Sequence, residues 1–150
     1  MRSHYCGDIN SSDIGSNIEI SGWVHKRRDH GGVIFLDIRD LYGIVQVVFN
    51  PNLKEIFDTA DSCRSEYVVC IEGLVRKRID GAINPKMTTG EIEIEATSLK
   101  IFSSAVTPQF PLDDYQDVNE DVRLKHRFLD LRRPDVNQRL IKRSQITSKI

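Results

Sequence analysis

Hydrophobic and polar residues alternate along five separate stretches of the chain, a pattern typical of strands that are buried on one face. The first stretch places Ile18, Ile20 and Val24 on one side, with Gly22 among them. We predict one β-strand for each stretch. The predicted strands cover residues 17–24, 33–39, 44–49, 67–75 and 91–96.

Polar turns connect the first three predicted strands into a meander. Residues 25–32 form a basic turn that ends in two glycines, and residues 40–43 form a second turn. After Pro51 the apolar residues recur at helical spacing, which predicts one short amphipathic helix. These apolar residues are Leu53, Ile56, Phe57 and Ala60.

Three strands, a helix and two further strands form the order of an OB-fold, a five-stranded Greek-key barrel. We therefore predict an all-β barrel over residues 1–104, with one short helix between strands three and four. Residues 105–122 are predicted to be an acidic, proline-containing linker. Residues 123–150 are predicted to be a hinge and the start of a C-terminal helix, because Pro134 suits the first turn of a helix.

Phe35 and Gln46 lie where a simple core pattern would place neither of them. Periodicity puts Phe35 on the polar side of the second strand and Gln46 on the outward side of the third. OB-folds bind oligonucleotides on this face, flanked by the loops that join strands one to two and four to five. Both loops are basic here, and an aromatic ring beside an amide suits an unpaired base. We predict a single-stranded nucleic acid as the ligand.

Composition limits the function classes. The chain has 150 residues, 39% of them hydrophobic, and a formal net charge of −1, so any site for a polyanion must be a local basic patch. The three cysteines form no CxxC pair, which favours reduced thiols in the cytoplasm and argues against zinc. Neither a signal peptide nor a membrane-spanning run is evident. We expect a soluble cytoplasmic protein with no metal site and no membrane partner.

Several short segments closely resemble bacterial aspartyl-tRNA synthetases. They are residues 22–29, 34–37, 39–40, 43–47 and 123–134. Lysyl- and asparaginyl-tRNA synthetases share the barrel but differ around residues 27–29 and 132–134. The resemblance implies that residues 1–104 are an anticodon-binding barrel. It further implies that the C-terminal helix begins motif 1, which belongs to the dimer interface in class II synthetases.

The resemblance also implies the activity of a whole enzyme. A homodimeric aspartate–tRNA ligase would activate aspartate with ATP and Mg²⁺ and transfer it to tRNA(Asp). Motifs 2 and 3, which bind ATP and magnesium in this family, are expected beyond Ile150. We therefore expect no catalytic residue and no cofactor within this chain.

Three residues of the predicted face match base-reading residues of the family. Phe35 resembles the aromatic residue that stacks on the middle anticodon base, which is a uracil. Gln46 resembles the amide that forms hydrogen bonds with the same uracil. Glu93 resembles the carboxylate that reads the first anticodon base. On the residues alone, alternatives stay open. In these alternatives, Phe35 is covered by a loop, Gln46 is an ordinary solvated strand residue, and Glu93 is a solvated glutamate like Glu91 and Glu95.

Five loop residues complete the predicted site. Arg28 and Arg78 resemble residues that contact the third base and nearby backbone, for which a guanidinium is well suited. Asn84 resembles a residue at the last anticodon base, and a turn-forming asparagine is an equally good explanation. His30 and Gly81 resemble the residue pair that non-discriminating enzymes carry at these two loop positions. Such enzymes also place aspartate on tRNA(Asn). The alternatives are turn chemistry at His30 and a positive φ at Gly81.

Two other functions are compatible with the sequence. A generic OB module for single strands would bind any short oligonucleotide with comparable affinity. A protein-interaction module would dock a peptide on Phe35, and the outward glutamates favour this alternative. Such a module predicts no salt-dependent binding of RNA.

Overall fold

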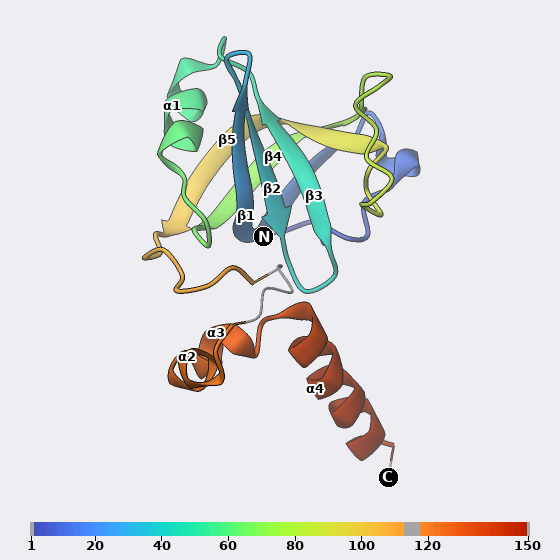
Figure 1. The fold of residues 1–150 in the computed structure, drawn as a ribbon. Helices are drawn as coiled ribbons and strands as arrows, with labels where there is room; N and C mark the ends of the chain where they lie inside the picture. The colour runs from blue at the N-terminus through green and yellow to red at the C-terminus, as the bar shows by residue number, and fades with distance from the viewer. Residues whose placement is uncertain (1, 113–117, 150) are drawn as a thin grey trace. The chain divides into compact units, whose positions relative to one another are not determined.

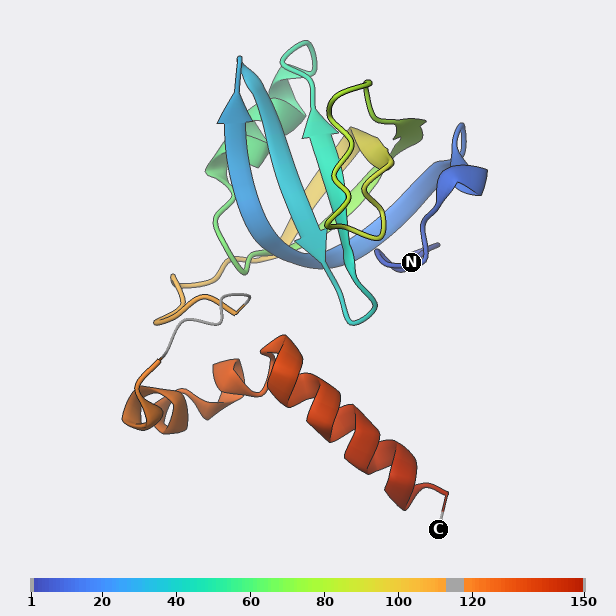
Figure 2. The ribbon, with the colours of Figure 1, turned by 45° about the vertical axis from the view of Figure 1, so that its right-hand side comes forward.

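The computed structural model describes residues 2–112 and 118–149, and the chain divides into one unit up to Thr107 and a second unit from Pro108. Figures 1 and 2 show the strands of the first unit and the helices of the second. The strands are β1 (Asn17–His30), β2 (Val33–Arg39), β3 (Ile44–Phe49), β4 (Val68–Lys77) and β5 (Ile92–Ser103). The helices are the 3₁₀ helix η1 (Ser11–Asp13), α1 (Lys54–Ser62), α2 (Glu120–Lys125), α3 (Arg127–Asp130) and α4 (Pro134–Thr147).

The five strands close into a barrel in the order β1-β2-β3-β5-β4, which confirms the predicted OB-fold. β1 pairs antiparallel with both β2 and β4, so it joins two sides of the barrel. A short parallel pairing of β3 with β5 completes the ring, with Val47 opposite Ile94 and Val48 opposite Glu95. The predicted bounds of β2 and β3 are those observed, and α1 follows β3 as expected.

The prediction that residues 25–32 form a turn was wrong for most of this segment. β1 continues to His30, and only Gly31 and Gly32, with φ of 63° and 78°, connect it to β2. The register shifts between Val24 and Lys26, which leaves His25 as the extra residue of a β-bulge. One extra residue reverses the side on which every following side chain lies.

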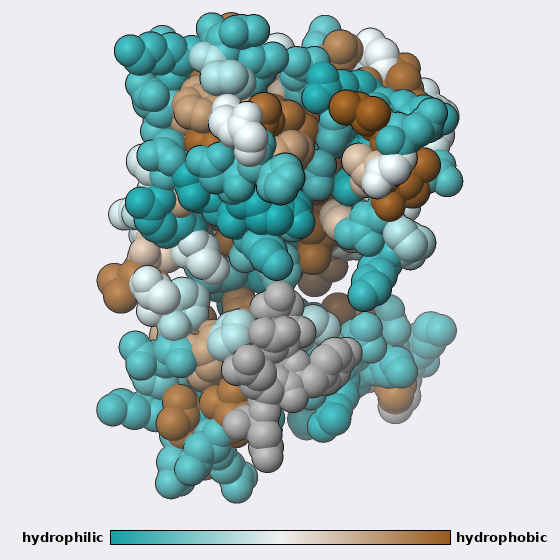
Figure 3. Space-filling model, turned by 45° about the horizontal axis from the view of Figure 1, so that its top comes forward, coloured by the Kyte–Doolittle hydropathy of each residue, from teal (hydrophilic) through white to brown (hydrophobic). Residues whose placement is uncertain are grey.

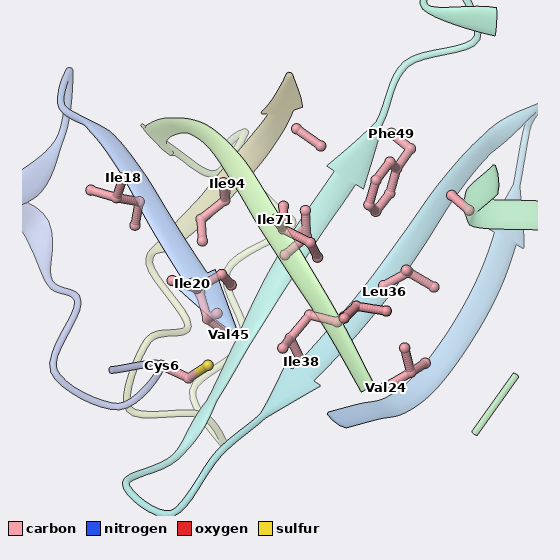
Figure 4. Packing of buried hydrophobic residues seen from close by; sticks show 14 of the residues in the cluster. Cys6, Ile18, Ile20, Val24, Leu36, Ile38, Val45, Phe49, Ile71 and Ile94 are labelled. Atoms are coloured by element: carbon pink, nitrogen blue, oxygen red, sulfur yellow. The ribbon is translucent and has the colours of Figure 1, made fainter. Parts of the chain in front are cut away.

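The core lies inside the barrel, and Figure 4 shows Ile20, Val45 and Ile71 converging there from three different strands. α1 packs against β2, β3 and β5, with Ala60 fully buried. Alternation explains this arrangement, because every second residue of each strand contributes to the interior. The other fully buried aliphatic residues of the strands are Val24, Ile34, Leu36, Ile38, Val47, Val69, Val75, Ile92, Ile94 and Ala96.

The second unit has a small apolar cluster of Phe110, Leu112 and Leu129. Beside it Asp130 is completely buried and accepts a 2.8 Å hydrogen bond from Nε of Arg123, with ion pairs to Arg127 and Arg133. Burial raises the pKa of Asp130, but the arginines outweigh burial and leave this pKa below its ordinary value. The carboxylate therefore stays ionised and joins α2, α3 and the start of α4.

α4 begins at Pro134, as predicted from the sequence. Residues 113–117 of the predicted linker lie outside the described residues. In the part of the chain that the structure describes, no helix combines the length and the apolar composition needed to cross a membrane.

Gly22 is required by the close packing of β1 on β2. A Cβ atom at this position would lie 2.5 Å from the carbonyl oxygen of Arg39. We expect Gly22→Ala to lower the free energy of unfolding by about 1–3 kcal/mol, the usual cost of overpacking. Urea denaturation measures this loss. Ser21→Ala is the matched control because Ser21 is only half-buried, and an equal loss in both variants would contradict the steric explanation.

Candidate nucleic-acid interface

Phe35 lies on the outer face of β2, where alternation predicted it. Its side chain is half-buried and is not part of the barrel core. Arg28 is its neighbour on β1 and Val48 its neighbour on β3. Figure 2 shows these three strands side by side, with the β4–β5 loop next to β3. The ring is therefore partly accessible between two neighbouring strands and within the face that OB-folds use for nucleic acids.

A continuous network of polar side chains crosses the barrel next to Phe35, and all five strands contribute to it. Arg28 donates to Oδ1 of Asp37 at 2.6 Å and to Oε1 of Gln46 at 3.2 Å. Gln46 in turn donates from Nε2 to Oε2 of Glu93 at 2.9 Å. We call this set the interface network. It consists of Arg28 of β1, Asp37 of β2, Gln46 of β3, Arg76 of β4, and Glu93 and Glu95 of β5.

The neighbours of Gln46 determine the orientation of its amide. A guanidinium has only donors and an ionised carboxylate only acceptors, so the carbonyl oxygen must face Arg28 and the amino group must face Glu93. Each neighbour uses one hydrogen-bonding position, which leaves one N–H and one acceptor position on the amide. Gln46 is only 8% exposed, so its two neighbours hold the amide in a fixed orientation.

Glu93 differs from the solvated glutamate that was its alternative explanation. It lies on the outer face of β5, but it is only 5% exposed because Gln46 and Arg76 cover it. Glu91 is exposed, and Glu95 is half-buried where it pairs with Arg76. A charge that is buried and fully hydrogen-bonded is costly to leave unpaired.

Asp37 is a member of the site that sequence analysis did not select, although it lies two residues from Phe35 on the same side of β2. Burial raises its pKa above the ordinary value, and the neighbouring Arg28, His25, Arg78 and Lys26 only partly oppose this rise. The signal that points to Asp37 is an acidic residue in a strand flanked by Leu36 and Ile38.

Arg28 reaches the site because of the bulge at His25. Without the extra residue, Arg28 would lie on the same side of β1 as Val24, which is buried in the core. Its side chain remains 39% exposed while it binds Asp37 and Gln46. Arg27 lies on the opposite side of β1 and forms an ion pair with Asp61 of α1.

Arg78 occupies a more internal position than the prediction of a base-contacting loop arginine implies. It is 4% exposed, and its Nε donates to the carbonyl of Ile92 at 2.9 Å. Burial lowers its pKa, and Glu93 and Asp37 oppose this change. Arg78 therefore holds the start of the β4–β5 loop against β5, and it lies close to Glu93 and Asp37 of the interface network.

The remaining predicted residues lie in the loops at the edge of this face. Asn84 accepts a hydrogen bond from the backbone N–H of Lys86 at 3.1 Å, so it has the turn-forming role that was its alternative. Gly81 has a φ of 93°, which an L-residue adopts only with strain. His30 is exposed at the end of β1, directly before the two turn glycines.

The surface of the barrel is mostly hydrophilic on the side shown in Figure 3, and its apolar patches are small and separate. The chemistry available on this outer face is the aromatic ring of Phe35, the oriented amide of Gln46 and two buried carboxylates, Asp37 of β2 and Glu93 of β5. Such a set recognises flat ligands with hydrogen-bonding edges. The fold and the site together define a nucleic-acid-binding OB domain.

Comparison with known proteins agrees with this class. The model of the tRNA anticodon family, described as an OB-fold nucleic acid binding domain, matches residues 18–102. The chain therefore belongs to this family.

Several solved structures are similar to the chain. One is the asparaginyl-tRNA synthetase from Pyrococcus horikoshii complexed with asparaginyl-adenylate, with 28% identity and a TM-score of 0.72 over 87% of this chain and 29% of that chain. A putative aspartyl-tRNA synthetase from Leishmania major Friedlin has 23% identity and a TM-score of 0.70, over 81% of this chain and 26% of that chain.

OBody AM2EP06 bound to hen egg-white lysozyme has 24% identity and a TM-score of 0.62, over 70% of this chain and 96% of that chain. The likenesses to the Leishmania enzyme and to the OBody show the fold alone. The chain spans less than a third of the length of either synthetase.

The raised pKa of Asp37 makes its charge a cost to the folded state. The folded protein binds this proton more tightly than the unfolded chain, so stability falls as pH rises from the unfolded pKa through the folded one. Asp37→Asn removes this titration. We therefore expect the free energy of unfolding of the variant, relative to the parent, to increase as the pH rises above the ordinary pKa of an aspartate, about 3.9.

Denaturant titrations of both proteins across this range measure the difference, in which other titrating groups cancel. Because the amide introduced by Asp37→Asn would still accept a hydrogen bond from Arg28, the comparison reports mainly the charge. A relative stability that decreases with pH would show that Arg28 outweighs burial.

Proposed function

We propose that the barrel binds the anticodon loop of tRNA(Asp) and of tRNA(Asn), as the N-terminal part of an aspartate–tRNA ligase. The observation that carries the proposal is the half-buried ring of Phe35 beside the oriented amide of Gln46 and the buried carboxylate of Glu93. Membership in the anticodon family and the 28% identity to an asparaginyl-tRNA synthetase support it.

Each of these side chains suits one part of an unpaired base. A base that stacks on Phe35 gains about 1–3 kcal/mol. The free N–H and acceptor position of Gln46 complement the edge of a uracil, which offers both an N–H donor and carbonyl acceptors. Glu93 attracts base N–H groups and repels phosphate, so it adds selectivity rather than affinity.

Exposed basic residues at the edge of the face supply attraction for the phosphate backbone. Lys26 of β1 and Lys77 of β4 are exposed, as is Lys86 of the β4–β5 loop. This basic edge explains how a chain with a net charge of −1 binds a polyanion. Binding of basic residues to the phosphates releases counterions from the RNA, and added salt opposes this release. The contribution of the basic edge should therefore weaken as the salt concentration rises.

The reaction and the dimer of the whole enzyme belong to the proposal as well. In this proposal α4 begins motif 1 and contributes to a homodimer interface. ATP and Mg²⁺ would be held by residues beyond this chain. Among the residues that the structure describes, no three His, Cys, Asp or Glu side chains are grouped to hold a metal ion.

Replacement of Phe35 separates binding from folding. We expect Phe35→Ala to weaken binding of the aspartate anticodon stem-loop by about 1–3 kcal/mol because stacking is lost. The loss of stability should stay well below the roughly 3–5 kcal/mol that is typical of a core phenylalanine. Fluorescence titration and thermal unfolding measure the two quantities.

Phe102 provides the matched control, since it is an exposed phenylalanine at the far end of β5. Phe102→Ala should leave RNA binding unchanged. If Phe35→Ala destabilises the barrel strongly and binding persists, Phe35 is a core residue and the proposal fails. Equal binding of a scrambled loop by the parent would instead indicate a generic single-strand module, and the absence of salt-dependent RNA binding would indicate a protein-binding module.

Dual specificity has its own test. The anticodons of tRNA(Asp) and tRNA(Asn) differ at the third position. His30 and Gly81 resemble the pair of loop residues found in enzymes that accept both tRNAs. We expect the two stem-loops to bind within about tenfold of each other, a difference of less than about 1.4 kcal/mol. A stem-loop altered at the middle base is the control and should bind more weakly than either. Preference for the aspartate loop by more than this margin would contradict dual specificity.

A further inference from the structure

We propose that the first and middle anticodon bases are recognised jointly, because Gln46 and Glu93 form one hydrogen-bonded unit whose geometry Arg76 fixes. This inference rests on the proposed function. It assigns to Arg76 the role of a positioning residue, which acts on the bases through Glu93 and Gln46.

The link between the two base-reading side chains is direct and buried. Nε2 of Gln46 donates to Oε2 of Glu93 at 2.9 Å, and the two residues are 8% and 5% exposed. A charge-assisted hydrogen bond that is shielded from water is stronger than one at the surface, and breaking it leaves a buried carboxylate oxygen without its partner. A base that moves one side chain must therefore move the other.

Arg76 holds the second oxygen of this carboxylate. It lies opposite Glu93 in the β4–β5 register and donates from Nε to Oε1 of Glu93 at 2.9 Å. Its NH1 group donates to Oε2 of Glu95, also at 2.9 Å. The planar guanidinium is thereby held between two carboxylates, which prevents rotation of the Glu93 carboxylate and keeps Oε2 directed toward Gln46.

The chain of contacts therefore runs from Arg76 through Glu93 and Gln46 to Arg28. Each member satisfies its neighbour, so the donors and acceptors left for the RNA are defined before binding. A wrong first base disturbs Glu93 and with it the amide that reads the middle base. Coupling between two sites of this kind typically changes affinity by about 5–150-fold.

Four anticodon stem-loops measure the coupling. They carry guanine or inosine at the first position and uracil or cytosine at the middle position, and inosine differs from guanine only by the missing 2-amino donor. For the 150-residue chain we expect the loss of affinity in the doubly altered loop to differ from the product of the two single losses by at least about fivefold.

The coupling factor is the ratio of the loss in the doubly altered loop to the product of the two single losses. Arg76→Met should bring this factor to within about twofold of one, because Glu93 then loses its fixed orientation. Arg76→Lys keeps the charge and should restore part of the coupling. Lys77→Met is the matched control, since the neighbouring Lys77 is exposed and is no member of the interface network. It should lower affinity for all four loops alike and leave the coupling intact.

The inference is overturned if the losses multiply independently in the parent, or if Arg76→Met binds RNA with unchanged coupling. Thermal unfolding of each variant shows whether a change in coupling reflects unfolding. If Arg76→Met is destabilised, Arg76→Lys decides the question. Reduced coupling in Arg76→Lys at parental stability supports the inference, and full parental coupling in this variant counts against it. Failure of the parent to bind any of the four loops refutes the proposed function instead.

Discussion

The short parallel pairing of β3 with β5 is the constraint on which the site depends. Gln46 and Glu93 are far apart in the sequence and come from strands that are not consecutive. Only closure of the barrel, with Val47 opposite Ile94, brings their side chains within hydrogen-bonding distance. A sheet left open at this seam would separate the two side chains to which the proposed function assigns base reading. In the proposed function, ring closure therefore contributes to recognition as well as to stability.

The sequence was sufficient to predict the outer face of β2 and β3. Alternation within each strand is a local property, and it placed Phe35, Asp37 and Gln46 on one side. The bulge at His25 was not predictable in this way. The apolar alternation of β1 stops at Val24, and the basic residues that follow give no signal of which side they occupy. Because the apolar alternation ends there, Arg28 was assigned to a loop. In the structure it belongs to the end of β1, and the inserted residue places it on the outer face opposite Phe35.

Burial on the outer face was also beyond the reach of periodicity. Alternation indicates the side of a sheet on which a side chain lies, but it gives no information on which long side chains fold over it. Arg76 covers Glu93, and Arg28 covers Asp37, so two carboxylates on the outer face are shielded from water. The same limit applies to Arg78. Its place in a basic loop suggested contact with RNA, whereas the structure directs its Nε to the backbone of Ile92.

A barrel that buries carboxylates on its surface loses some stability, as the raised pKa of Asp37 shows. The gain is a set of donors and acceptors whose directions are fixed before RNA arrives. Side chains that are already held by their neighbours lose little conformational freedom on binding, which lowers the entropic cost of association. The outer face combines this ordered polar network with the half-buried ring of Phe35. Stacking on the ring tolerates any base. In the proposed function, discrimination between bases therefore comes from the network, and it depends on how firmly Arg76 and Arg28 hold Glu93 and Gln46.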